Sequence, residues 1–130
     1  MNTILLIEDD PDILDNMTEY LVLEGYNIIG ANNGRKGIEL ALEFMPDLII
    51  CDVLMREMNG HEVLRLLLDT AKISGIPFIF STSLSESIDR TTSLKLGAVD
   101  YIIKPFKLES LLNMIRTWIN FPEQRQNCVF

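Results

Sequence analysis

Cysteine and histidine are scarce in this chain of 130 residues, which contains two of the first and one of the second. The cysteines, Cys51 and Cys128, lie far apart in the sequence, and Cys51 belongs to an apolar run. A disulfide framework is therefore not expected. The spacing of the cysteines and the single histidine does not match a zinc-binding pattern either.

Long apolar runs and an excess of positive charge are also lacking. The longest apolar runs have no more than about five or six residues, far short of a membrane span, and the first residues lack the basic start of a signal peptide. We therefore expect a cytoplasmic protein. Eleven basic residues against 19 acidic ones give a net charge of −8, so nucleic acid and membrane surfaces are poor partners.

Hydrophobic residues make up 48 % of the chain, and apolar and charged segments alternate along it, as is typical of a globular protein. A chain of this length is expected to form one domain. We place that domain at residues 1–120. Residues 121–130 then form a polar tail, which is either a frayed end or the start of a linker.

Five short apolar runs alternate with segments in which apolar residues recur at helical spacing. Runs of this kind are typical of strands buried on both faces of a parallel sheet. The strands are predicted at residues 3–7, 27–31, 48–52, 78–80 and 101–103, and the helices at residues 11–24, 38–44, 63–68, 85–96 and 108–119. This alternation predicts an α/β fold with helices on both faces of the sheet and right-handed crossovers.

Functional side chains follow or end four of the five predicted strands. Parallel strands place their C-terminal ends at one edge of the sheet, so these side chains can converge there. Taken one at a time, such residues have ordinary roles, for example as helix caps; we assign Asp10 to capping. The residues are Glu8, Asp9, Asp10, Asp52, Thr82 and Lys104.

Carboxylates that lie within a few ångströms of one another repel unless a cation or a proton intervenes. Mg²⁺ suits this set because it takes one or two carboxylates and leaves positions for phosphate oxygens. A lysine and a hydroxyl group nearby would suit a phosphoryl group. No Gly-rich phosphate loop is present, so the phosphate would arrive on a side chain and not on a bound nucleotide.

Four blocks of the sequence resemble the receiver domain of two-component response regulators. The resemblance runs from residue 2 to about residue 120 and implies a flavodoxin-like three-layer sandwich. Its five-stranded parallel sheet would have the order 2-1-3-4-5 and be accompanied by five helices. The blocks are residues 5–12, 52–60, 76–82 and 96–106.

The resemblance implies a phosphoacceptor role for Asp52, which would attack a phosphohistidine on a sensor histidine kinase or phosphotransfer protein. Mg²⁺ would be held by Glu8, Asp9, Asp52 and the backbone carbonyl of Leu54. Lys104 would pair with the phosphoryl oxygens. The chain would thus be no enzyme beyond its own phosphorylation and dephosphorylation.

The resemblance also implies a switch made of Thr82 and Tyr101. Thr82 would hydrogen-bond the phosphoryl group, and Tyr101 would turn inward as that hydroxyl moves. The signalling face would comprise the fourth helix, the fifth strand and the fifth helix. It would control an output domain or a partner protein, and a dimer through this face is one possibility.

Two departures from the family pattern bear on these expectations. Arg56 stands where the family usually has proline, which removes a fixed φ angle and leaves the loop less rigid. We expect it to touch no proposed ligand. Val99 and Met114 replace an acid and an arginine of the DNA-binding winged-helix branch, so the dimer contacts of that branch are not expected here.

Three alternatives belong to other functional classes. A degenerate receiver would act as a phosphorylation-independent interaction module, against which the intact set of acids, hydroxyl and lysine speaks. An aspartyl-phosphate phosphatase would need an aspartate at position 54, which is Leu54. A flavodoxin-like electron carrier would need a phosphate-binding loop after the first strand, where this chain has three acids.

Overall fold

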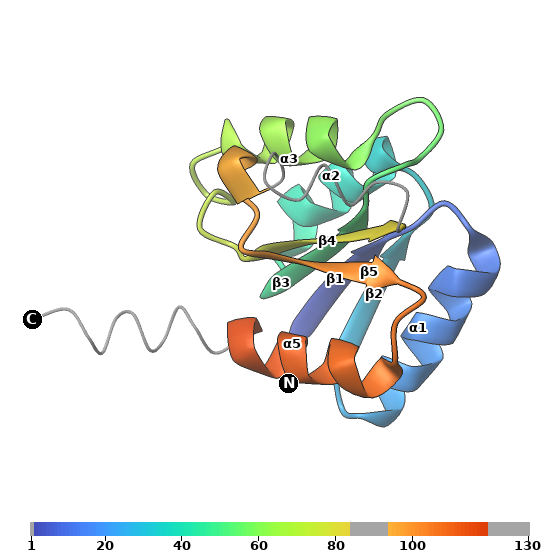
Figure 1. The fold of residues 1–130 in the computed structure, drawn as a ribbon. Coiled ribbons are helices and arrows are strands. Elements are labelled where there is room, and N and C mark those ends of the chain that lie inside the picture. Colours follow the sequence, from blue (N-terminus) through green and yellow to red (C-terminus); the bar gives the residue numbers. More distant parts are fainter. Residues whose placement is uncertain (1, 84–93, 120–130) are drawn as a thin grey trace, which may run out of the picture.

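A five-stranded parallel sheet lies between two layers of helices in the computed structural model, which describes residues 2–83 and 94–119 (Figure 1). Residues 94–96 are helical, and the rest of the predicted fourth helix, residues 85–93, lies outside the described residues. The elements are β1 (Thr3–Ile7), α1 (Pro11–Leu23), β2 (Asn27–Ala31), α2 (Gly34–Phe44), β3 (Leu48–Asp52), α3 (Gly60–Leu68), β4 (Phe78–Ser83), β5 (Asp100–Lys104) and α5 (Leu108–Ile119).

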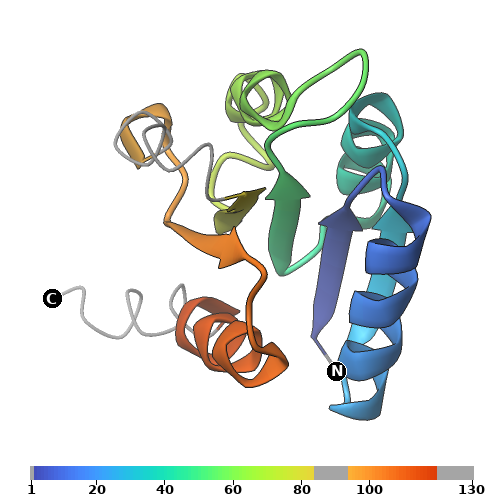
Figure 2. The same ribbon diagram turned by 45° about the vertical axis from the view of Figure 1, so that its right-hand side comes forward.

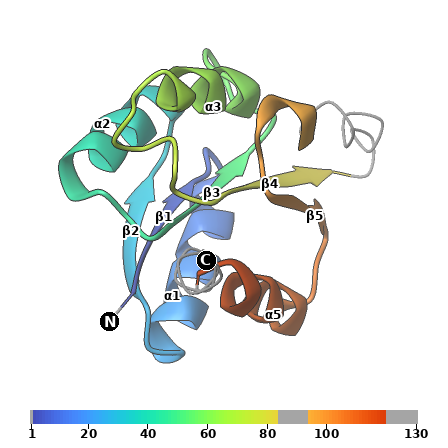
Figure 3. The same cartoon turned by 90° about the vertical axis from the view of Figure 1, so that its left-hand side faces the viewer.

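The strand order is β2-β1-β3-β4-β5, and every neighbouring pair is parallel, which confirms the predicted topology. Helices α2 and α3 cover one face of the sheet, and α1 and α5 cover the other (Figure 3). Among the described residues, no helix combines the length and the apolar character needed to cross a membrane.

The central strands are buried on both faces, which explains why their sequences are continuously apolar. In β1, Leu5 and Ile7 pack in the cluster under α2 and α3, whereas Ile4 and Leu6 pack in the cluster under α1 and α5. Successive side chains of a strand point to opposite faces, so a two-sided core requires an apolar residue at every position.

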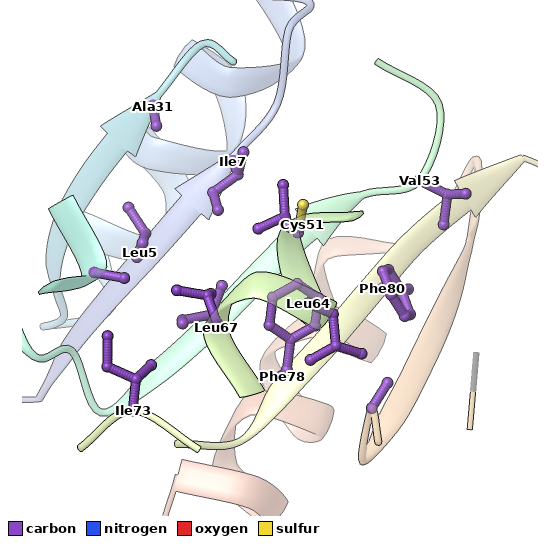
Figure 4. Packing of buried hydrophobic residues seen from close by; sticks show 14 residues of the cluster. Leu5, Ile7, Ala31, Cys51, Val53, Leu64, Leu67, Ile73, Phe78 and Phe80 are labelled. Atoms are coloured by element: carbon purple, nitrogen blue, oxygen red, sulfur yellow. The ribbon is translucent and has the colours of Figure 1, made fainter. Parts of the chain in front are cut away.

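Helix α3 covers part of the cluster that lies under α2 and α3. Its residues Leu64 and Leu67 lie beside Phe78 of β4 (Figure 4). Cys51 belongs to the same cluster and is buried, as its place in an apolar run predicted. This packing fixes α3, and with it the loop that joins α3 to the end of β3.

Helices α2 and α3 begin earlier than the sequence pattern predicts, at Gly34 and Gly60. The prediction followed apolar residues, and glycines and polar caps carry no such signal. Asn33 caps α2 by accepting the Lys36 backbone N–H, and Asn59 opens a capping box at α3. These caps satisfy backbone groups that have no partner inside a helix.

Hydrogen bonds hold two turns of the chain at the C-terminal edge of the sheet. Asp10 accepts the backbone N–H groups of Asp12 and Ile13, so its predicted capping role at α1 is confirmed. Gly60 donates its backbone N–H to the Val53 carbonyl at 2.8 Å. A Cβ atom at Gly60 would clash with the Asp52 carbonyl oxygen, so only glycine lets α3 start so close to the end of β3.

Candidate functional site

The C-terminal ends of β1, β3 and β5 bring together Glu8, Asp52 and Lys104. Strands β1 and β3 lie side by side with their arrowheads at the same edge (Figure 2). Their register pairs Ile7 with Cys51, so the next residues, Glu8 and Asp52, are neighbours. Both are buried, with 3 % and 7 % of their surface exposed. The predicted convergence of these side chains is confirmed.

Lys104 joins the two buried acids. Its Nζ lies 2.6 Å from Glu8 Oε1 and 3.3 Å from Asp52 Oδ1. The lysine comes from β5, the far edge strand, and reaches past the end of β4 to do so. Buried charges are stable only when they are paired and hydrogen-bonded, and a single ammonium group serves two carboxylates here.

Asp9 completes the acidic group and contacts the loop after β3. Its Oδ2 accepts the backbone N–H of Arg56 at 3.2 Å, and Nε of the Arg56 guanidinium lies 3.9 Å from the same oxygen. The expectation that Arg56 touches no proposed ligand is therefore wrong. The loop folds back across the edge of the sheet, and the periodicity of helices and strands does not predict such a path. Because residue 56 is not proline, it also has a backbone N–H to donate to Asp9.

The three carboxylates are arranged for a hard cation. One oxygen each from Glu8, Asp9 and Asp52 lie within 4.8 Å of one another. Three carboxylate oxygens this close together, with one lysine nearby, fit a divalent ion such as Mg²⁺, which prefers oxygen ligands. Leu54, whose backbone carbonyl the sequence predicted as a further ligand, lies two residues after Asp52 and is 62 % exposed.

Burial and a neighbouring acid shift the pKa of Asp52 upward. Burial and then the charge of Glu8 raise the pKa of Asp52 from its usual 3.8 to about 7, against the opposing effect of Lys104. Burial lowers the pKa of Lys104, but its hydrogen bond to Glu8 and the charges of both acids outweigh this and raise it. Burial also raises the pKa of Cys51, with Asp52 and Glu8 adding to the effect, so this thiol stays protonated.

Thr82 lies near the C-terminal end of β4, and Tyr101 lies near the start of β5. Thr82 is buried, and its Oγ1 donates to the Ser83 carbonyl at 3.5 Å. It follows Ser81, which pairs with Asp52 in the sheet register. Tyr101 is half-buried, pairs with Phe80, and packs against the cluster under α2 and α3.

A groove of about 500 Å³ borders Lys104, between α1 and the chain that joins β5 to α5. The sequence reasoning missed this groove, because it depends on how α1 and α5 are placed and not on either helix alone. It adjoins the site, and its lining is largely apolar, which suits a protein surface better than a small anion. The lining residues are Ile13, Asn16, Met17, Ser83, Lys104, Pro105, Phe106 and Leu108.

The raised pKa of Asp52 predicts a stability that falls with rising pH when no metal is added. Between pH 3.8 and about 7 the folded chain holds a proton on Asp52 that the unfolded chain has lost. The free energy of unfolding should therefore fall, by up to about 1.4 kcal/mol per pH unit. Lys104 adds no slope in this range, since its pKa lies above it.

Urea unfolding in EDTA at pH 5, 6, 7 and 8 measures this slope. Asp52→Asn cannot hold that proton, so it should flatten the slope between pH 5 and 7 and be more stable than the wild type at pH 8. An equal slope in both proteins would show that Asp52 is not the titrating group.

Comparison with known proteins gives consistent results. A family model for the response regulator receiver domain matches residues 4–116. The transcriptional regulatory protein CpxR of Escherichia coli K12 is 37 % identical over 130 residues, covering 98 % of this chain and 54 % of CpxR. Protein PilH of Pseudomonas aeruginosa is 34 % identical, covering 88 % of this chain and 95 % of PilH. The chain thus spans about half the length of CpxR and nearly all of PilH.

Solved structures show the same architecture. The signal receiver domain of a signal transduction histidine kinase from Syntrophus aciditrophicus has a TM-score of 0.85 and 35 % identity, covering 92 % of this chain and 91 % of that one. A response regulator receiver domain protein from Clostridium thermocellum has a TM-score of 0.88 and 25 % identity, covering 95 % and 98 %. Sequence blocks, sheet order and the family model agree, and the chain belongs to the family of response regulator receiver domains.

Proposed function

We propose that this chain accepts a phosphoryl group on Asp52 from a phosphohistidine of a sensor histidine kinase or phosphotransfer protein. The observation that carries the proposal is the contact of Lys104 Nζ with both Glu8 and Asp52, at the edge where three carboxylates converge. A partly buried lysine shared by two acids is placed to bind the oxygens of an incoming phosphoryl group.

The transfer forms one bond and breaks one. A carboxylate oxygen of Asp52 attacks phosphorus, the phosphorus–nitrogen bond breaks, and its electron pair returns to the imidazole of the donor. Lys104 moves its hydrogen bond from Glu8 to a phosphoryl oxygen. Mg²⁺, held by Glu8, Asp9 and Asp52 with the Leu54 carbonyl, supplies positive charge to the phosphoryl oxygens when bound.

In this proposal the chain is a phosphoacceptor and not an enzyme acting on other substrates. A phosphatase of the aspartyl-phosphate type would place a carboxyl group two residues after the nucleophile, and the side chain there is that of Leu54. The alternative of a phosphorylation-independent interaction module is less well supported, since the Glu8–Lys104–Asp52 contacts are intact. The apolar groove beside Lys104 offers a donor protein a surface next to Asp52.

Phosphorylation should be read out by Thr82, Tyr101 and the face that comprises the fourth helix, β5 and α5. Thr82 is buried on β4, and β4 pairs with β5, which carries Tyr101, so a shift of the Thr82 hydroxyl is transmitted to Tyr101 through packed strands. This face would control an output domain or a separate partner. CpxR, a transcriptional regulator, is about twice as long as the matched part. A dimer through the same face remains a prediction.

Acetyl phosphate and Mg²⁺ should add one phosphoryl group to the protein, as measured by intact mass. Asp52→Asn should abolish the added mass, because the attacking carboxylate is lost, and EDTA should abolish it in the wild type. Asp15→Asn removes an exposed carboxylate from α1 and serves as the matched control, which should be labelled like the wild type. Labelling of Asp52→Asn at the wild-type level would refute the assignment.

Beryllofluoride, which mimics a bound phosphoryl group, should alter hydrogen exchange most strongly at one side of the sheet. With Mg²⁺ present, we expect the largest changes in residues 78–83 and 94–104, where Thr82 and Tyr101 lie, and smaller ones in α2. Thr82→Ala should bind beryllofluoride but show a much smaller change at residues 94–104. Changes confined to α2 and β2 would rule out the proposed signalling face.

A further inference from the structure

Arg56 places two donor groups against one carboxylate oxygen of Asp9. The backbone N–H lies 3.2 Å from Oδ2, and the guanidinium Nε lies 3.9 Å from it. Asp9 is one of the three acids whose oxygens converge. A positive charge of the chain itself therefore lies at the mouth of the acidic cluster, where a metal ion would also bind.

The loop after β3 is built to hold this contact. Gly60 N–H binds the Val53 carbonyl, which closes the loop, and Met58 N–H binds the Arg56 carbonyl at 2.8 Å. Glu57 adopts a left-handed conformation, with φ of 70°, which turns the chain sharply after Arg56. A proline at position 56 would have no N–H to offer Asp9.

The two donors differ in their effect on a dication. The backbone N–H is neutral and fixes the orientation of the Asp9 carboxylate. The guanidinium carries a full charge, which partly offsets the charge of Asp9 in the metal-free protein and repels a dication bound to it. The Arg56 side chain is 89 % exposed, so water and salt screen this charge strongly.

Space for the arginine to withdraw lies next to the contact. A hollow of about 290 Å³ is lined by Asp9, Asn32, Asn33, Arg56 and Glu57. Its walls are largely polar, so a guanidinium displaced from Asp9 stays solvated there.

We propose that Arg56 is a positioning residue with two opposed effects on the metal site. Its backbone N–H orients Asp9 for Mg²⁺, whereas its guanidinium is an internal counter-ion that competes with Mg²⁺. The inference rests on the proposed Mg²⁺ site. Without metal, the acidic cluster should therefore destabilise this chain less than it destabilises a receiver with proline at this position. A higher concentration of Mg²⁺ should be needed to fill the site.

Three variants separate the two effects. Arg56→Gln removes the charge and keeps the N–H, Arg56→Pro removes both, and Lys72→Gln removes an exposed charge before β4, at the opposite edge of the sheet. In calorimetric Mg²⁺ titrations, Arg56→Gln should bind about threefold more tightly than the wild type at low salt, with a smaller gain at about 0.5 M salt. Lys72→Gln should match the wild type, and Arg56→Pro should bind less tightly than Arg56→Gln.

Melting temperatures give a second readout that a merely structural role would not produce. In EDTA, Arg56→Gln should melt below the wild type, because the acids lose a nearby cation; at saturating Mg²⁺ the difference should vanish or reverse. Unchanged or weaker Mg²⁺ binding by Arg56→Gln would overturn the counter-ion role. Equal affinities of Arg56→Gln and Arg56→Pro would overturn the role of the N–H. A wild type that binds no Mg²⁺ would instead refute the proposed function.

Discussion

The hydrogen bond between Lys104 and Glu8, with Asp52 within reach of the same ammonium group, is the interaction on which the site depends. One positive charge is shared by two buried acids, so the cluster keeps an excess of negative charge. Burial and the charge of Glu8 together raise the pKa of Asp52, and Arg56 pairs with Asp9 at the rim of the cluster. Buried ion pairs contribute little net stability. The cluster is therefore better explained by the chemistry it permits than by the stability of the fold.

The sheet order makes this cluster possible. Because β1 lies beside β3, Glu8 and Asp52 become neighbours although they are 44 positions apart in the sequence. Strand β4 lies between Asp52 and Lys104, and it ends in the small residues Ser81, Thr82 and Ser83. Bulky side chains at that end would obstruct the path that Lys104 takes toward Glu8.

Much of this arrangement can be predicted from the sequence, for identifiable reasons. Strands buried on both faces are continuously apolar in sequence, so the predicted bounds of β1 and β3 agree with the structure. Charged residues that end such apolar runs mark the C-terminal edge of the sheet. Helix starts at Gly34 and Gly60 were missed because caps and glycines carry no apolar periodicity. The contact between Arg56 and Asp9 was not predicted, because it joins two loops whose relative position no periodic pattern shows. The raised pKa of Asp52 depends on burial and register together, which only the structure combines.

The most direct test of the account is a crystal structure of the chain with Mg²⁺ and beryllofluoride. The account predicts beryllofluoride on Asp52 and Mg²⁺ at about 2.1 Å from carboxylate oxygens of the cluster. It also predicts that Lys104 Nζ moves from Glu8 to one fluorine atom and that the Thr82 hydroxyl turns toward a second fluorine atom. A structure with Lys104 still on Glu8, and with metal and beryllofluoride bound away from Asp52, would contradict it.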